Sequence, residues 1–397
     1  MPASDYPIWR KPQHHMDADH SSDHVHWVEL FYDLIHVVTI FLLGNYLSHH
    51  HGLDGFLTFA LMFTALWFAW ADLSVFNSVF LCTDWQHRCT MALQIVTVMI
   101  AAASIPAITG NGWAFFALAF ALNKALLAFL YMRSNRHDLE SSIGNRVAWR
   151  FLIVAAIFLV SAVLPKPLAY WAFAFAVVLI QIFYMAPKFG MIAMPRFQPR
   201  VGHLMERFAL LTLIVLGEGF FKLVTTLTEK GIYKVSPDVM FNFILGGVAI
   251  FVMAWIYFDF VGNAKPKDEK KWTLVIIWLA HLVLMMSGVM VGVALAGEVK
   301  VGFFEPYPIE YRAIGCFGMI GYLGALWVIQ TQIDRHRTRQ FADGKLRLVG
   351  IGLAFICYLV VPYVPAIIGN FFFAAALFTQ IVIPLMRGYR YFEAEES

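Results

Sequence analysis

"HWVELFYDLIH", residues 26–36, places three ionisable side chains at the start of an apolar segment. Glu29, Asp33 and His36 follow one another at intervals of four and three residues, so on a helix they share one face. The apolar segment continues to about residue 47, which is the length needed to cross a bilayer. Ionisable groups at bilayer depth are costly, and they persist where they face a protein interior or a water-filled cavity. The stretch therefore predicts a transmembrane helix with a polar face.

The composition of the whole chain agrees with a membrane location. Of the 397 residues, 60% are hydrophobic and 14% are charged, with a mean hydropathy of +0.67. A soluble domain is about 45–50% apolar and about 25% charged. The net charge of +3 is too small to indicate nucleic acid, and the glycine signatures of Rossmann folds and P-loops are absent. The four cysteines match neither a zinc site nor a disulfide framework, so free thiols are expected.

Apolar segments of spanning length recur along the chain and predict an all-α polytopic transmembrane helix bundle. Twelve spans are expected, at about 28–47, 55–80, 89–108, 113–132, 148–164, 167–187, 206–226, 238–262, 272–296, 309–333, 347–363 and 365–386. The boundaries at "PKP" and "PYVP" are the weakest. A count of ten stays open if either pair of segments is a re-entrant hairpin.

Lysine and arginine residues give the bundle an orientation. Most of the 29 basic residues fall in the termini and in five alternate loops, 81–89, 132–150, 187–207, 263–271 and 333–348. Cytoplasmic loops carry this excess in membrane proteins. We therefore expect a multi-pass protein of the bacterial plasma (inner) membrane with both termini in the cytoplasm. Because residues 1–25 are polar, no cleavable signal peptide is expected, and the first span serves as an uncleaved anchor.

Weak similarity between the two halves predicts an internal repeat. "VELFYDL" at 28–34 recurs as "MERFALL" at 205–211, and the segments around Asp72 and Asp259 also align. Six helices in each half would give a parallel repeat about an axis along the membrane normal. The alternative is a chance alignment of apolar residues. The expected parts are a polar tail at 1–27, a first repeat at 28–187, a cytoplasmic linker at 188–205, a second repeat at 206–386 and a C-terminal tail at 387–397.

Several glycines have the spacing of close helix contacts. Gly288 and Gly292 are four residues apart, and glycine recurs every third residue from Gly315 to Gly324. Small residues at such spacing allow helices to approach closely. We interpret both patterns as packing.

Several quoted motifs resemble one known family. "WVELFYDLIHVV", "ALWFAWADLSVFN", "HLMERFALLTLIVLGEGFFKLV", "IYFDF" and the histidine in "WLAHLVLMMSGVMVG" are similar to the bacterial low temperature requirement A family, most clearly over residues 27–300. The resemblance implies a polytopic plasma-membrane protein that is linked by name to growth in the cold. It supplies neither a reaction nor a substrate. At 217–219 the chain reads Gly-Glu-Gly, where the family more often has Gly-Glu-Ser.

The rise of about 1.5 Å per residue in a helix sorts the intramembrane charges by depth. The expected inner group comprises Glu29, Asp33, Asp72 and Asp259 together with His36, and the expected deeper group comprises Lys124, Glu218, Lys222 and His281.

Each of these groups also has a structural interpretation. Asp33 and Asp72 suit a hydrogen-bonded pair between adjacent helices, and Glu218 and Lys222 suit a neutralising i,i+4 pair. His281 suits a packed histidine. Glu29 and Asp259 suit interfacial positions, which carboxylates favour at a helix N-terminus or near water.

Buried carboxylates beside histidine and lysine are the usual parts of a proton or cation path. The leading hypothesis is a proton- or cation-coupled secondary transporter or permeation pathway. In it Glu218 is the central carrier, modulated by Lys222. His281 is a relay, and Asp33, His36 and Asp72 form the cytoplasmic entry.

Two alternatives stay open for the function. One is a membrane-embedded enzyme or envelope factor acting on a lipid-linked substrate, and the other is a non-catalytic cold-growth sensor or scaffold. An enzyme is disfavoured because no nucleophile–base motif is present. Neither a cofactor nor a metal is expected, and the histidine-rich run at 14–26 is interpreted as a disordered tail. The expected partners are membrane lipid and protons, small ions or solutes, without nucleic acid, and a homo-oligomer stays open.

Overall fold

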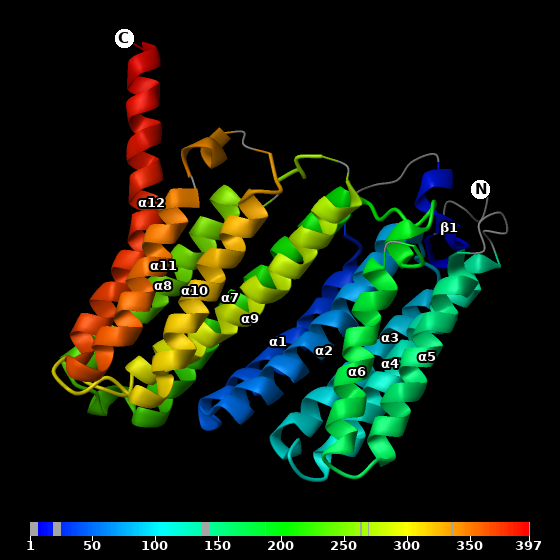
Figure 1. The fold of residues 1–397 in the computed structure, drawn as a ribbon, viewed down its shortest axis with the longest axis horizontal. Coiled ribbons are helices and arrows are strands. Elements are labelled where there is room, and N and C mark those ends of the chain that lie inside the picture. Colours follow the sequence, from blue (N-terminus) through cyan, green and yellow to red (C-terminus); the bar gives the residue numbers. More distant parts are fainter. Residues whose placement is uncertain are drawn as a thin grey trace. The chain divides into compact units, whose positions relative to one another are not determined.

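The chain folds almost entirely into α-helices (Figure 1). The computed structural model describes residues 7–18, 25–136, 143–186, 188–262, 264–268, 270–334, 337–342 and 344–396. Within these residues the long helices are α1 (Trp27–His49), α2 (Leu53–Val79), α3 (Trp85–Ser104), α4 (Gly112–Asn135), α5 (Ile143–Val163), α6 (Leu168–Met185), α7 (Val201–Lys230), α8 (Pro237–Phe260), α9 (Lys271–Glu298), α10 (Ile309–Gln330), α11 (Gly344–Val360) and α12 (Ala366–Glu396).

Twelve helices of the described chain, some extended by a 3-10 turn, are long and apolar enough to cross a membrane. This confirms the prediction of an all-α polytopic bundle. The "PKP" and "PYVP" boundaries each separate two long helices, α5 from α6 and α11 from α12. Helices suit this composition because each one satisfies its backbone hydrogen bonds internally, which lipid requires.

The ends of the helices follow local chemistry. Asp84 precedes α3, and its side chain accepts a hydrogen bond from the His87 amide. Pro237 occupies the first turn of α8, where its missing N–H is not needed. Three expected boundaries differ most from the structure. α5 begins at Ile143 instead of residue 148, α7 begins at Val201 instead of residue 206, and α12 ends at Glu396 instead of residue 386.

Short elements complete the described chain. They are the strands β1 (Gln13–His14) and β2 (Phe80–Leu81) and the 3-10 turns η2 (Pro7–Trp9), η3 (His15–Asp17), η4 (Ile105–Ala107), η5 (Met191–Ala193), η6 (Ile232–Lys234), η7 (Arg337–Phe341) and η8 (Val361–Tyr363).

The expectation that the histidine-rich run at 14–26 is disordered is wrong for residues 14–18. β1 pairs antiparallel with β2, so that His14 lies opposite Phe80. The His14 ring is buried, and its Nε2 lies 3.0 Å from the carbonyl oxygen of Arg196. The segment docks because this imidazole has both an aromatic neighbour and a hydrogen-bond partner. Residues 19–24 of the histidine-rich run lie outside the described part of the chain.

The chain divides into two compact units. Unit 1 comprises Met1–Leu43 and Ala60–Arg207, and unit 2 comprises Gly44–Phe59 and Phe208–Ser397. In unit 1, α3 to α6 pack against one another in sequence order, and in unit 2, α9 to α12 do the same. The predicted internal repeat and domain boundaries stay predictions.

Candidate functional site

Three helices of unit 1 bring together a group of buried side chains, here called the Arg207 cluster: Glu29 and Asp33 of α1, Trp70 of α2, and His203 and Arg207 of α7. Arg207 Nη2 lies 2.9 Å from Asp33 Oδ1, and Arg207 Nη1 lies 3.7 Å from Glu29 Oε2. His203 Nε2 lies 3.2 Å from the same glutamate oxygen. Trp70 Nε1 donates to Asp33 Oδ1 at 2.7 Å. One guanidinium therefore serves two carboxylates.

The start of α7 is held in place by contacts with the end of α2. Arg200 donates from Nη2 to the carbonyl of Asn77 at 2.8 Å and from Nε to the carbonyl of Ser78 at 3.2 Å. One and a half to two turns later, Arg207 donates to the Ser74 hydroxyl at 3.0 Å. These bonds fix the rotation of α7, so the planar fork of Arg207 faces the carboxylates.

A second buried ion pair in unit 1 joins α2 to α4. Lys124 Nζ lies 2.5 Å from Asp72 Oδ2, and neither side chain is exposed to solvent. Lys124 also donates to the carbonyl of Phe68 at 3.2 Å. Counting residues along the helices predicts Lys124 in the deeper group and Asp72 in the inner group. The structure instead pairs them, because a lysine side chain is long enough to reach a carboxylate at another depth.

Tyr32 connects the Arg207 cluster to this pair. The buried Tyr32 lies within electrostatic range of Arg207, Asp33 and Asp72 and within hydrogen-bonding reach of Asn123, the neighbour of Lys124. Its hydroxyl donates to the carbonyl of Ala69 at 3.3 Å. The predicted hydrogen-bonded pair of Asp33 and Asp72 is thus replaced by two carboxylates that have separate cations and share a tyrosine neighbour.

His36 lies one turn beyond Tyr32 on α1. Its Nδ1 lies 3.1 Å from the Tyr32 carbonyl, and its ring packs against the Tyr32 ring. Its Nε2 is buried and has no hydrogen-bond partner among the described residues, and the same holds for Asp33 Oδ2 and Asp72 Oδ1. These three atoms can each accept a proton without breaking an existing hydrogen bond.

Unit 2 contains the other predicted carrier, Glu218. This side chain is buried against α1, where a Cβ added to Gly44 would lie 3.8 Å from Glu218 Oε1. Lys222 interacts with it electrostatically. Lys222 also donates to the side chain of Asn45 and, at 3.2 Å, to the hydroxyl of Ser48. The lysine therefore bridges α7 and α1 within this unit as well as facing Glu218.

His281 and Asp259 have the contacts of structural residues. His281 Nε2 lies 3.1 Å from the Tyr257 hydroxyl, its Nδ1 lies 2.8 Å from the Ile277 carbonyl, and its ring stacks on Phe208. Asp259 is exposed and accepts a hydrogen bond from Trp255 at 2.7 Å. These are the packed-histidine and interfacial alternatives named above.

Sequence reasoning missed Arg207, His203 and Tyr32. Arg207 was counted among the basic residues of the loop 187–207, although the expected seventh span at 206–226 already included it. Extending the helix back to Val201 places His203 and Arg207 at i and i+4 on one face, and that spacing was readable in the sequence. Tyr32 sits inside the quoted "VELFYDL" and was treated as an ordinary apolar position.

Two further groups of buried polar side chains in unit 2, one of two residues and one of three, were also missed. Glu298 accepts a hydrogen bond from the Tyr307 hydroxyl at 2.8 Å. Arg347 donates to Gln330 at 3.1 Å and to Gln380 at 2.9 Å. Across the described residues, no group of three or more His, Cys, Asp or Glu side chains is arranged to hold a metal ion.

Comparison with known proteins identifies the family. Residues 24–383 match the family model described as "Bacterial low temperature requirement A protein (LtrA)". Comparisons with curated proteins and with solved structures give no match. Since the family match covers most of the chain, including every span from α1 to α11, this multi-pass membrane protein belongs to the bacterial low temperature requirement A family.

Proposed function

We propose that the protein is a proton- or cation-coupled transporter or permeation pathway of the bacterial plasma membrane, with both termini in the cytoplasm. The observation that carries the proposal is the buried polar network of unit 1, in which Tyr32 lies between the Arg207 cluster and the Asp72–Lys124 pair. If buried carboxylates have only a structural role, each one is expected to have its own cation. The Arg207 cluster has two carboxylates for one arginine.

Charge counting gives the cluster a role in coupling. Arg207 balances one of the two negative charges on Glu29 and Asp33. An uncompensated charge is expensive away from water. A proton or a small cation that joins the cluster balances the second charge, and His203 and the second oxygen of Asp33 are available to hold a proton. Arg207 can then shift between the carboxylates as the proton moves.

A transport assay tests the proposal directly. Purified protein in liposomes that contain a pH-sensitive dye should show proton movement under an imposed gradient of protons or of a test cation. Asp33→Asn keeps the size and the Trp70 hydrogen bond of the side chain but removes its charge. Because Glu29 still balances Arg207, the variant should fold and lose flux. Asp259→Asn is the matched control, since it removes an exposed carboxylate from a span.

The outcome that contradicts the proposal is a folded Asp33→Asn protein with the flux of the wild type. Absence of flux in wild-type protein across protons, sodium and potassium would contradict it as well. Metal-dependent turnover of lipid in the same vesicles would favour the enzyme alternative instead.

Variants of the Asp72–Lys124 pair distinguish a structural role of the pair from a role in the transport path. Lys124→Met leaves a buried aspartate without its cation, which costs about 3–5 kcal/mol of stability. The double variant Asp72→Leu, Lys124→Met removes both charges and should regain most of that stability. If the pair belongs to the path, the double variant is stable and has reduced flux. A stable double variant with unchanged flux would remove the pair from the path.

A further inference from the structure

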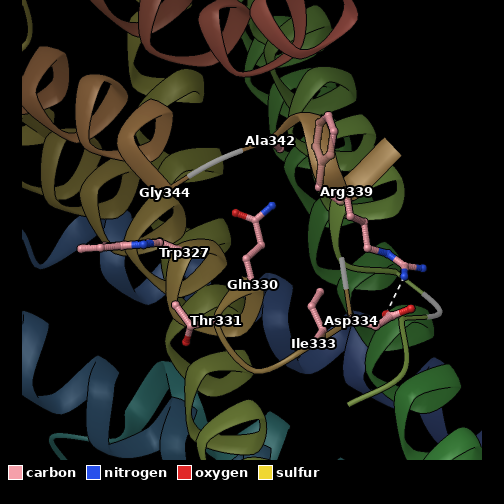
Figure 2. Close-up of a pocket in the computed structure, with 9 residues that line it drawn as sticks. Trp327, Gln330, Thr331, Ile333, Asp334, Arg339, Ala342 and Gly344 are labelled. Atoms are coloured by element: carbon pink, nitrogen blue, oxygen red, sulfur yellow. Dashed lines mark hydrogen bonds and ion pairs between the residues drawn. The ribbon is translucent and has the colours of Figure 1, made fainter. Parts of the chain in front are cut away.

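A pocket lies in unit 2 beside the end of α10 (Figure 2). Its enclosed space is about 20 Å³, room for about one water, and it opens to solvent. It is lined by Phe260 of α8, Trp327 and Gln330 of α10, the loop that carries Asp334, the 3-10 turn that carries Arg339, and Gly344 at the start of α11. The basic-residue pattern places this end of the unit in the cytoplasm.

The side chain of Gln330 is a buried amide directed into this pocket, and one of its two polar atoms has no hydrogen-bond partner among the described residues. Gln330 is 9% exposed, and Figure 2 shows its side chain reaching into the space between α10 and the segment that carries Arg339. Its Oε1 accepts a hydrogen bond from Arg347 Nε at 3.1 Å, which fixes the orientation of the amide. The opposite atom, Nε2, has no hydrogen-bond partner among the described residues. A buried donor of this kind costs free energy until an acceptor meets it.

The charges around the pocket favour an anionic acceptor. Arg339 Nη1 lies 2.6 Å from Asp334 Oδ1, so the aspartate charge is balanced, while Arg339 Nε is buried without a hydrogen-bond partner in the described chain. The buried guanidinium of Arg347 lies behind Gln330. Lys267 adds a cation at the rim, where it donates to the Thr331 carbonyl at 2.7 Å. The N-terminus of α11 adds its positive dipole end at Gly344.

We propose that this pocket binds the phosphate group of an acidic phospholipid of the cytoplasmic leaflet. A phosphodiester supplies acceptor oxygens for Gln330 Nε2 and Arg339 Nε. Its negative charge interacts favourably with the positive dipole end at the N-terminus of α11. Basic pockets between transmembrane helices on the cytoplasmic side are a recurring form of headgroup recognition. Trp327 is 37% exposed beside the pocket, and aromatic side chains of this kind mark the headgroup level. The enclosed space has room for one phosphate oxygen, while the rest of the headgroup lies at the opening and the acyl chains remain along the apolar surface of α10.

A charge substitution at Gln330 tests the site with little change in shape. Gln330→Glu keeps the acceptor for Arg347 and so preserves the buried bond, but it replaces the free donor by a carboxylate oxygen. Gln332→Glu is the matched control, because it adds the same charge to the adjoining loop at a side chain that does not line the pocket. Binding is measured by native mass spectrometry of the purified, delipidated protein. The ligands are phosphatidylglycerol, phosphatidylethanolamine with the same acyl chains, and inorganic phosphate.

We expect saturable binding of phosphatidylglycerol, in preference to phosphatidylethanolamine, by wild-type protein and by Gln332→Glu. Gln330→Glu should bind at least about tenfold more weakly, the effect of losing one hydrogen bond to a charged group. Arg339→Gln should weaken binding similarly, and it provides the test if Gln330→Glu does not fold. Equal binding by the two glutamate variants, or equal binding of the two lipids, would overturn the site. Displacement of the lipid by inorganic phosphate at comparable affinity would overturn the lipid as its source.

Discussion

Arg207 interacts with both carboxylates of the Arg207 cluster. Its guanidinium is fully buried, contacts Glu29 and Asp33, and lies over the Trp70 ring at 5.4 Å. The planar fork allows one residue to serve two acceptors, which the point charge of lysine does less well. Arg207 is therefore a structural link between α1 and α7. In the proposed function it balances only one of the two carboxylates and leaves the other negative charge for a proton.

Removal of Arg207 should be strongly destabilising. Arg207→Gln leaves two buried carboxylates without their cation, so we expect a loss of about 3–5 kcal/mol in unfolding free energy. Arg196→Gln is the comparison, because the Arg196–Asp17 pair is partly exposed and should contribute within about 1 kcal/mol. Thermal unfolding in detergent measures both. Equal losses in the two variants would show that the Arg207 cluster is hydrated and not buried.

At the scale of elements, α7 and α9 approach closely through two glycines of unit 2. A Cβ built on Gly292 would lie 3.1 Å from the Gly219 Cα, and one built on Gly219 would lie 2.9 Å from Ile250 Cδ1. This confirms the interpretation of Gly292 as a packing residue. The contact brings the Glu218 turn of α7 against α9, so the position of that carboxylate depends on the absence of two side chains.

Gly292→Val should separate α7 from α9. Overpacking of this kind costs about 1–3 kcal/mol. Gly217→Val is the matched control on α7, since a Cβ there meets nothing within 4 Å. We expect thermal unfolding to show a clear loss for Gly292→Val and little change for Gly217→Val. A Gly292→Val protein as stable as the wild type would contradict the close approach.

The docked N-terminal segment is an element with an expected pH dependence. Burial lowers the pKa of His15 from its usual 6.5, and the hydrogen bond to the Gln198 carbonyl opposes this effect. The pKa of His15 is lower in the docked segment than in the released segment. The released segment therefore binds a proton more readily. The docked form is therefore fully stable above pH 6.5 and weakens as the pH falls below that value.

Hydrogen exchange of residues 13–17 at about pH 8 and about pH 5, corrected for the intrinsic pH dependence, measures this undocking. Protection should decrease at the lower pH. His15→Gln keeps a donor for the Gln198 carbonyl and cannot titrate, so its protection should depend less on pH. Equal pH dependence in the two proteins would exclude His15 as the cause.

At the scale of the whole molecule, the number of spans and the basic loops together define a topology. If all twelve candidate spans of the described chain cross the membrane, the loop at residue 230 and the loop at residue 267 lie on opposite sides. Reporter fusions after Lys267 and after Arg390 should be cytoplasmic, and a fusion after Lys230 should be external. A cytoplasmic reporter after Lys230 would contradict the topology from α7 onward.

The sequence by itself determined the fold class, the spans and the family of this protein. Length and apolar character decide whether a segment crosses a bilayer, and both are local properties of the chain. The spacing of Glu29, Asp33 and His36 likewise indicated a polar face on α1, because helical periodicity relates positions along one element. The predicted boundaries were accurate to about five residues except at the end of α12, where polar and charged residues are part of the helix.

Only the tertiary structure decided which charges meet. The pairing of Lys124 with Asp72, and of Arg207 with Asp33, depends on the rotation and axial offset of helices that are far apart in sequence. A depth estimate from residue counting cannot supply either quantity, and it ignores the reach of lysine and arginine side chains. For the same reason it grouped Asp259 with the buried carboxylates although the folded chain leaves that residue exposed. Ion pairing is a property of distances between elements, and those distances exist only once the helices have packed.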